Sequence, residues 1–66
     1  MRIILNGAEK ELAQEINLKN LIGQFCRDPQ RVIAELNGTV VKSREWEQQA
    51  LKDGDTLELV NFVGGG

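Results

Sequence analysis

The two Asn-Gly dipeptides of this chain constrain its fold more strongly than any other feature of the sequence. Asn6-Gly7 follows an apolar, β-branched run at residues 2–5, and Asn37-Gly38 separates an alternating run at residues 32–36 from a β-branched run at residues 39–41. Both positions of an Asn-Gly pair tolerate the positive φ angles of a type I′ turn, which joins two antiparallel strands. The sequence therefore predicts two β-hairpins.

A single short helix is predicted between the hairpins. Asn17 is a suitable N-cap, and apolar residues follow it with the spacing of one helical face, at Leu18, Leu21, Ile22 and Phe25. Pro29 is expected to stop this helix of about ten residues, because proline keeps the residue before it out of the α-helical region.

The remaining segments complete an α+β domain. A polar strand, suited to a sheet edge, is predicted from about residue 9 to residue 13 or 14, and the last strand covers residues 56–63. The predicted order is two strands, one helix and three strands, so the helix covers one face of an antiparallel-rich sheet. With 66 residues the chain forms one small domain over residues 1–63, followed by a mobile glycine tail at residues 64–66.

Composition excludes several classes of chemistry. The chain contains no histidine, so serine–histidine–aspartate catalysis, cysteine–histidine catalysis and histidine-ligated metal sites are impossible within it. Its one cysteine forms no internal disulfide. A net charge of −2 argues against nucleic acid as a partner, and no apolar run is long enough for a signal peptide or a membrane span. We therefore expect a cytoplasmic protein with no membrane partner.

Several conspicuous residues have a structural interpretation. Cys26 is expected to be a small buried hydrophobe rather than a reactive thiol, and Trp46 is expected to fill the core under a loop. Asp53 and Asp55 flank a glycine and predict a turn, because two carboxylates alone make a poor calcium or magnesium site. Gly23 costs about 1 kcal/mol relative to alanine inside a helix, although it permits a close backbone approach.

The glycines at residues 64–66 have no local structural use after a strand. They are either an inert, frayed end or a tail that enters a channel too narrow for any Cβ and delivers the α-carboxylate of Gly66 to a distant active site. That carboxylate has a pKa of about 3.3–3.7, so it is ionised at neutral pH and can attack the α-phosphate of ATP. A sulfur or amine nucleophile then displaces the acyl-adenylate, and another protein must bind the ATP.

At this point the sequence resembles a known family. Residues 36–41, 44–46, 51–55 and 63–66, together with the order of the predicted elements, are similar to the ubiquitin-like β-grasp sulfur carriers. Within that group the chain looks most like the ThiS family, the sulfur carriers of thiamine biosynthesis, over its whole length. One departure is Lys42, where members of the family often carry proline; it affects a loop rather than the tail. The resemblance implies a mixed sheet of about five strands packed on one helix.

The resemblance also implies a reaction cycle in which the chain is a carrier and not an enzyme. An E1-like adenylating enzyme of the ThiF type uses ATP and magnesium to activate Gly66, while the carrier itself holds no cofactor. Sulfur from a persulfide, formed from cysteine by a cysteine desulfurase, converts the carboxylate to a thiocarboxylate. A thiazole synthase of the ThiG type then takes this sulfur into the thiazole ring of thiamine.

Strand parity predicts a partner-binding patch. If Leu57 and Leu59 face the helix, then Val60 and Phe62 lie on the open face of the sheet. The same argument, applied to the strands expected beside the last one, gives one apolar patch next to the tail, made of Ile4, Ile33, Val60 and Phe62. Val63, the last residue before the glycines, is assigned to the same partner-binding patch. Exposed apolar clusters of this kind mark partner sites. The alternative is that Phe62 folds back over the sheet edge.

Three other functions remain open for a chain of this type. The first is the small subunit of a molybdopterin synthase, which has the same fold and tail, although those proteins are usually longer. The second is a ubiquitin-like modifier, in which Gly66 is joined to a lysine of a target protein. The third is an interaction module whose terminal glycines are inert.

Overall fold

The computed structural model describes residues 1–12 and 15–61 of the chain. In chain order the elements are β1 (Arg2–Leu5), β2 (Ala8–Glu11), α1 (Leu18–Phe25), the 3₁₀ helix η1 (Pro29–Arg31), β3 (Val32–Leu36), β4 (Thr39–Val41), the 3₁₀ helix η2 (Ser43–Gln48) and β5 (Thr56–Asn61). The predicted order of strands and helix is confirmed.

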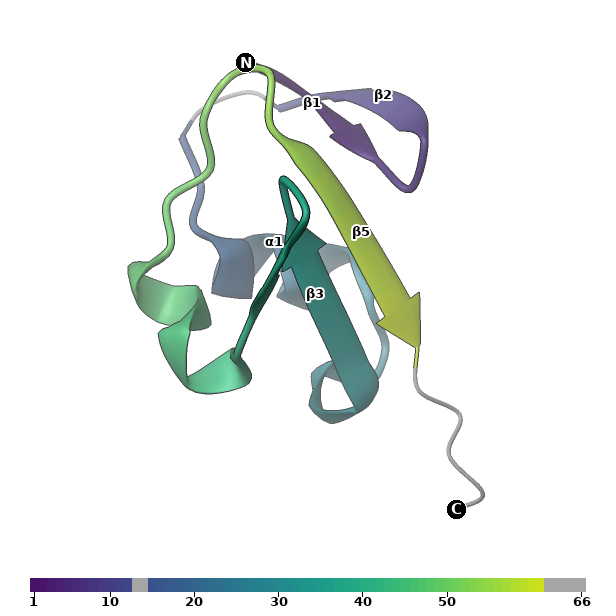
Figure 1. Cartoon of the computed structure of the whole chain (residues 1–66), viewed down its shortest axis with the longest axis vertical. Helices are drawn as coiled ribbons and strands as arrows, with labels where there is room; N and C mark the ends of the chain where they lie inside the picture. The colour runs from purple at the N-terminus through teal and green to yellow at the C-terminus, as the bar shows by residue number, and fades with distance from the viewer. Residues whose placement is uncertain (13–14, 62–66) are drawn as a thin grey trace.

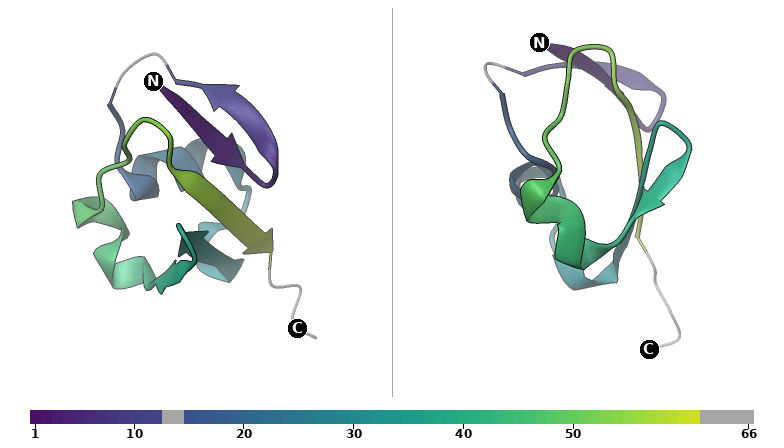
Figure 2. Two further views of the ribbon diagram at one scale, coloured as in Figure 1. Left: turned by 45° about the horizontal axis from the view of Figure 1, so that its top comes forward. Right: turned by 60° about the vertical axis from the view of Figure 1, so that its left-hand side comes forward.

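The five strands form one mixed sheet in the order β2-β1-β5-β3-β4 (Figure 1). β5 lies in the centre, parallel to β1 and antiparallel to β3, and the two hairpins flank it. Helices α1 and η2 cover the same face of the sheet (Figure 2). No helix among the described residues covers the other face, called the outer face below. The predicted α+β architecture is therefore confirmed.

Both Asn-Gly dipeptides form the predicted turns. The φ angles are +50° and +83° at Asn6 and Gly7, and +51° and +86° at Asn37 and Gly38. These values match a type I′ turn, in which both central residues have positive φ. The first hairpin pairs β1 with β2, a strand shorter than predicted, and the second pairs β3 with β4. Residues 13 and 14, the predicted end of β2, lie outside the described residues.

Helix α1 begins where the sequence indicates but ends earlier. The side-chain Oδ1 of Asn17 accepts a hydrogen bond from the backbone N–H of Asn20 at 2.8 Å, which makes Asn17 the N-cap. The helix has eight residues and ends at Phe25, because Cys26 takes an extended conformation. Pro29 does not stop it; this proline opens η1 instead.

The prediction that Phe25 belongs to the buried helix face is wrong. Leu18, Leu21 and Ile22 are fully buried, whereas Phe25 is 46% exposed. Since the helix ends at Phe25, this ring lies at the margin of the core, and the Nζ of Lys10 sits 5.6 Å from its ring centroid.

One apolar core fills the space between the sheet and the helices. It consists of the inward residues of the strands, the buried face of α1, and two anchors from the chain that follows β4: Ile3, Leu5, Val32, Ala34, Leu36, Val41, Leu57, Leu18, Leu21, Ile22, Trp46 and Leu51, with Leu12 beside them. Trp46 is 5% exposed and its Nε1 donates to the carbonyl oxygen of Val41 at 2.8 Å. The core assignment of this tryptophan is confirmed. No helix within residues 1–12 and 15–61 has the length and apolarity needed to cross a membrane.

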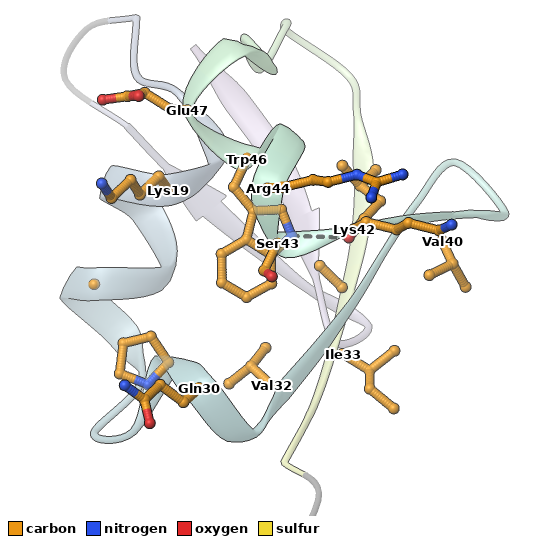
Figure 3. A pocket seen from close by; sticks show the side chains of 14 residues that line it. Lys19, Gln30, Val32, Ile33, Val40, Lys42, Ser43, Arg44, Trp46 and Glu47 are labelled. Carbon is orange, nitrogen blue, oxygen red and sulfur yellow. Dashed lines mark hydrogen bonds between the residues drawn. The ribbon is translucent and has the colours of Figure 1, made fainter.

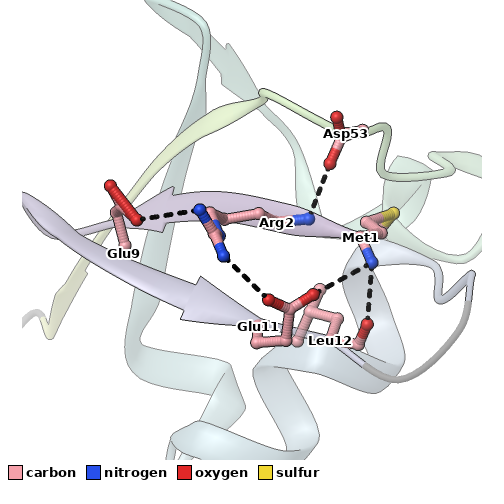
Figure 4. A network of polar contacts seen from close by, with 6 residues as sticks. All are labelled: Met1, Arg2, Glu9, Glu11, Leu12 and Asp53. Carbon is pink, nitrogen blue, oxygen red and sulfur yellow. Dashed lines mark hydrogen bonds and ion pairs between the residues drawn. The ribbon is translucent and has the colours of Figure 1, made fainter.

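Polar contacts tie the first two residues to β2 on one side and to the turn before β5 on the other (Figure 4). The ammonium group of Met1 and the guanidinium of Arg2 both contact Glu11, at 3.3 and 3.2 Å. The hydrogen bond from Arg2 is the main cause of the lowered pKa of Glu11. This carboxylate therefore stabilises the fold at pH values above its ordinary pKa, and the stabilisation is lost as the pH falls through the lowered pKa.

The two aspartates before β5 accept backbone hydrogen bonds. Asp53 accepts from the backbone N–H of Arg2 at 2.7 Å, and Asp55 accepts from the backbone N–H of Lys52. The predicted turn at these aspartates is confirmed.

Replacing Gly23 by alanine is expected to raise the free energy of unfolding by about 0.5–1 kcal/mol. This residue lies inside α1, and a Cβ added to it meets no atom within 4 Å. Urea denaturation of Gly23→Ala beside the wild type measures the effect. Gly38→Ala is the control and should be destabilised, because its φ of +86° disfavours any Cβ. A Gly23→Ala variant no more stable than the wild type would contradict this reading of the helix.

Candidate functional site

The candidate site is the carboxyl end of β5, which precedes the glycine tail by two residues in the sequence. β5 lies between β1 and β3 and ends at Asn61, whose partner in the ladder is Val32, the first residue of β3. The predicted site residues Phe62, Val63, Gly64, Gly65 and Gly66 lie outside the described residues. The described part of the site is therefore the strand that leads to the tail and the surfaces beside that strand.

Asn6 and Asn37 hold β5 from its two sides. The Oδ1 of Asn6 accepts the backbone N–H of Leu59 at 2.8 Å, and the backbone N–H of Asn6 donates to the carbonyl oxygen of Leu57 at 2.9 Å. On the other side, the Oδ1 of Asn37 accepts the backbone N–H of Thr56 at 2.9 Å. The Nδ2 of Asn37 also donates to Asp55 at 3.0 Å.

These contacts give each Asn-Gly turn a second role that the sequence analysis missed. Beyond the ends of β1 and β3, the asparagine side chains satisfy backbone groups of β5 that the hairpins themselves do not pair. The register of β5 is fixed by side chains as well as by the ladder. The sequence feature that indicates this second role is asparagine at the first position of both turns, because its side-chain amide can both accept and donate hydrogen bonds.

Strand parity correctly predicts the exposed residues of the outer face. Ile4, Ile33 and Val60 are 38%, 43% and 54% exposed, while Leu57 is buried and Leu59 is partly buried. Val40, which the sequence analysis did not include, is also exposed, at 57%.

The structure brings only some of these residues together. Ile33 and Val60 are direct cross-strand partners, whereas Ile4 pairs with Thr56, about 13 Å earlier along β5. Glu35 and Glu58 face each other between the two positions. Ile4 is therefore not continuous with Val60, because β1 pairs with the beginning of β5 and not with its end. We call Ile33, Val40 and Val60 the outer-face patch.

Cys26 has no feature of a reactive thiol. It is partly buried against the core, in a hollow that Lys10, Phe25 and Leu59 also line. Burial raises the pKa of its thiol, so at neutral pH the sulfur is protonated and a weak nucleophile. The described residues hold no group of three or more Cys, Asp and Glu that could bind a metal ion.

Comparison with known proteins gives a consistent result. The model of the ThiS family matches residues 3–66. The crystal structure of the thiamine biosynthesis protein ThiS from Geobacter metallireducens superposes with a TM-score of 0.87 at 30% identity, and the match covers the whole of both chains. The predicted β-grasp fold is confirmed by this likeness.

Two curated relatives add detail. The sulfur carrier protein ThiS of Bacillus subtilis is 29% identical over 94% of this chain and 96% of its own length. A thiazole synthase of Paramagnetospirillum magneticum is 35% identical over all 66 residues of this chain. The chain spans only 20% of the length of that synthase, which is a much larger protein.

The two roles of Asn37 can be separated by substitution. Asn37→Ala is expected to lower the free energy of unfolding by about 2–3 kcal/mol, because it removes the side-chain hydrogen bonds and because alanine tolerates positive φ less well than asparagine. Asn37→Gly accepts the φ angle and loses only the hydrogen bonds, so we expect a loss of about 1–2 kcal/mol. Urea denaturation measures both. Wild-type stability of the glycine variant would show that the contacts to Thr56 and Asp55 contribute nothing.

Proposed function

This chain belongs to the ThiS family of sulfur carriers in thiamine biosynthesis, and on that basis we propose that the carboxylate of Gly66 is the group that receives the sulfur. The observation that carries the proposal is the placement of β5. Its backbone is held on both sides as far as Leu59, and the three glycines follow it closely in the sequence. Five residues extend at most about 18 Å beyond Asn61.

The chemistry begins with activation of the carboxylate. A carboxylate oxygen of Gly66 attacks the α-phosphorus of ATP, pyrophosphate leaves, and an acyl-adenylate forms in an adenylating enzyme that binds ATP and magnesium. The outer sulfur of a persulfide then attacks the acyl carbon and AMP leaves. A thiol cleaves the resulting sulfur–sulfur bond, forming a disulfide with the persulfide's former carrier and releasing the thiocarboxylate. The chain supplies the acyl group and its binding surfaces, and the partners supply catalysis.

A thiazole synthase is the proposed acceptor of the sulfur. The thiazole synthase of P. magneticum contains a segment similar to the whole of this chain. Two modules in one polypeptide meet at a high effective concentration, which favours a functional pairing between them. An enzyme that binds ATP is proposed because the carboxylate must be activated. Its E1-like type, and the cysteine desulfurase that provides the persulfide, are proposed because the resemblance to the family implies them.

The outer-face patch is the proposed docking surface for these enzymes. Ile33 and Val60 lie side by side at the end of β5 from which the tail leaves. A partner that covers this patch receives the tail within a few residues of the contact. Exposed branched side chains at the root of the tail thus give binding energy and also position the tail.

Mass spectrometry tests the chemical proposal. The intact mass of the chain must first correspond to a carboxyl terminus at Gly66. After incubation with the adenylating enzyme, ATP, magnesium, cysteine and a cysteine desulfurase, we expect one oxygen of Gly66 to be replaced by sulfur. Deletion of Gly66 shortens the reach by about 3.3–3.6 Å and should abolish the exchange without affecting the fold. Gly65→Val should do the same by steric exclusion.

Two results would contradict this proposal. One is an unchanged mass when the same enzymes load an established carrier in parallel. The other is normal loading of the variant that lacks Gly66, since the carboxylate would then not need its full reach. Isopeptide adducts on lysines of other proteins would instead favour a ubiquitin-like modifier.

Substitutions on the sheet test the docking surface. Ile33→Ala combined with Val60→Ala is expected to weaken binding to the adenylating enzyme about tenfold or more, because each residue loses apolar contact area. Ile4→Ala is the matched control on the same face and should change the dissociation constant less than about twofold. Isothermal titration calorimetry measures all three proteins. If the double variant and the control change the dissociation constant equally, the outer-face patch is not the docking surface.

A further inference from the structure

A groove that the predicted chemistry does not use lies along the β4 side of the domain (Figure 3). Ile33 and Val40 of the outer-face patch are among the residues that line it, so the groove adjoins the patch. α1 and η1 form one wall, and β4 and the start of η2 form the other. Its floor is apolar and includes Val32, Ala34 and Trp46. Because these residues also belong to the core, the groove has a rigid base.

The groove follows a strand edge that is only partly paired. β3 pairs with β5 along its whole length, from Val32 to Leu36, but it pairs with β4 only from Ala34 onward. Val32 and Ile33 therefore have a strand neighbour on one side only. An extended segment of another protein can lie against such an edge.

One wall of the groove contains a glycine that the fold does not require. Gly23 lines the groove from inside α1, where glycine lowers stability, and a Cβ at this position would enter open space. No contact within the described chain accounts for the missing side chain. A close approach by a second molecule does account for it.

The rim of the groove carries positive charge on an acidic protein. Lys19, Lys42 and Arg44 line it, and none of them takes part in an ion pair among the described residues. Glu47 is the one acidic residue of the lining. Figure 3 places Lys42 and Arg44 together on the β4 side, whereas Lys19 and Glu47 lie on the α1 side. The β4 rim is thus cationic while the chain as a whole has a net charge of −2.

The groove also lies close to the root of the tail. Val32, in its floor, is the ladder partner of Asn61 at the end of β5. Adjacent strands are about 4.8 Å apart, so a protein that receives the tail also reaches this groove.

We propose that the groove docks an extended segment of the thiazole synthase, with an apolar residue over Trp46 and Val32 and carboxylates facing Lys42 and Arg44. The backbone of the segment passes close to Gly23. The choice of partner rests on the proposed function, whereas the chemistry of the segment follows from the groove. Charge at its rim sets the orientation of the segment and the rate of association.

Charge reversal tests the rim. Lys42→Glu combined with Arg44→Glu is expected to raise the dissociation constant for thiazole synthase about tenfold or more. Lys10→Glu combined with Lys52→Glu changes the net charge equally, away from the groove, and should have an effect of less than about twofold at physiological salt. Equal weakening by both double variants would overturn the proposal, because net charge alone would then explain it.

A steric substitution tests the glycine. Gly23→Leu places a side chain in the groove and should weaken binding about tenfold or more, while its melting temperature stays at or above that of the wild type. Gln24→Leu adds the same side chain to α1 outside the groove and should bind normally. Wild-type affinity of Gly23→Leu would overturn the proposal.

The single tryptophan, Trp46, can be used to identify the molecule that binds in the groove. Because the chain contains one tryptophan and it lines the groove, fluorotryptophan labelling gives one fluorine NMR signal from the site. We expect this signal to shift on addition of unlabelled thiazole synthase and not to shift with carrier concentration alone. A shift with carrier concentration would assign the groove to a second copy and overturn the proposal.

The outcomes separate this inference from the proposed function. If the wild type acquires sulfur at Gly66 and binds the synthase, but the groove variants bind equally well, only the inference fails. If the wild type acquires sulfur but does not bind the synthase, the inference and the choice of acceptor both fail, while carboxylate activation stands.

Discussion

The rest of the structure depends on the hydrogen bonds that backbone N–H groups of β5 donate to the side chains of Asn6 and Asn37. β5 is the central strand, so its register determines how the two hairpins align in the sheet. A side-chain amide from each neighbouring hairpin fixes that register. The same two residues adopt the positive φ angles that reverse the chain. Turn formation and the register of β5 are therefore coupled in one pair of residues, because each side-chain amide satisfies a backbone group that would otherwise lack a partner.

Features that depend on neighbouring residues were predictable from the sequence, whereas features that depend on distant pairings were not. The two turns, the cap at Asn17 and the inward side of each strand follow from local φ preferences and from side-chain alternation. Phe25 was misplaced because its burial depends on how far α1 extends over the sheet. The sequence analysis places Ile4 beside Val60, whereas Ile4 pairs with Thr56. The register between the parallel strands β1 and β5 depends on residues far apart in the chain, so no local sequence pattern predicts it.

The two faces of the sheet and its β4 edge carry separate tasks. The inner face makes the core, the outer face presents Ile33 and Val60, and the edge borders a groove with a cationic rim, which Ile33 also lines. Gly23 illustrates the tension between stability and binding, since an alanine there improves the helix without any steric conflict inside the molecule. Sites that serve a partner commonly retain such locally unfavourable residues, because stability is traded against function at those positions.

The parallel pairing of β1 with β5 has a kinetic consequence. These strands come from opposite ends of the chain, and every other element lies between them in the sequence. Contacts of such large sequence separation close long loops and slow folding. Until β5 inserts, the two hairpins have no common neighbour and the apolar face of the sheet is divided in two. The carboxyl end of β5, with Ile33 and Val60 paired beside it, therefore forms only when the whole sheet has assembled.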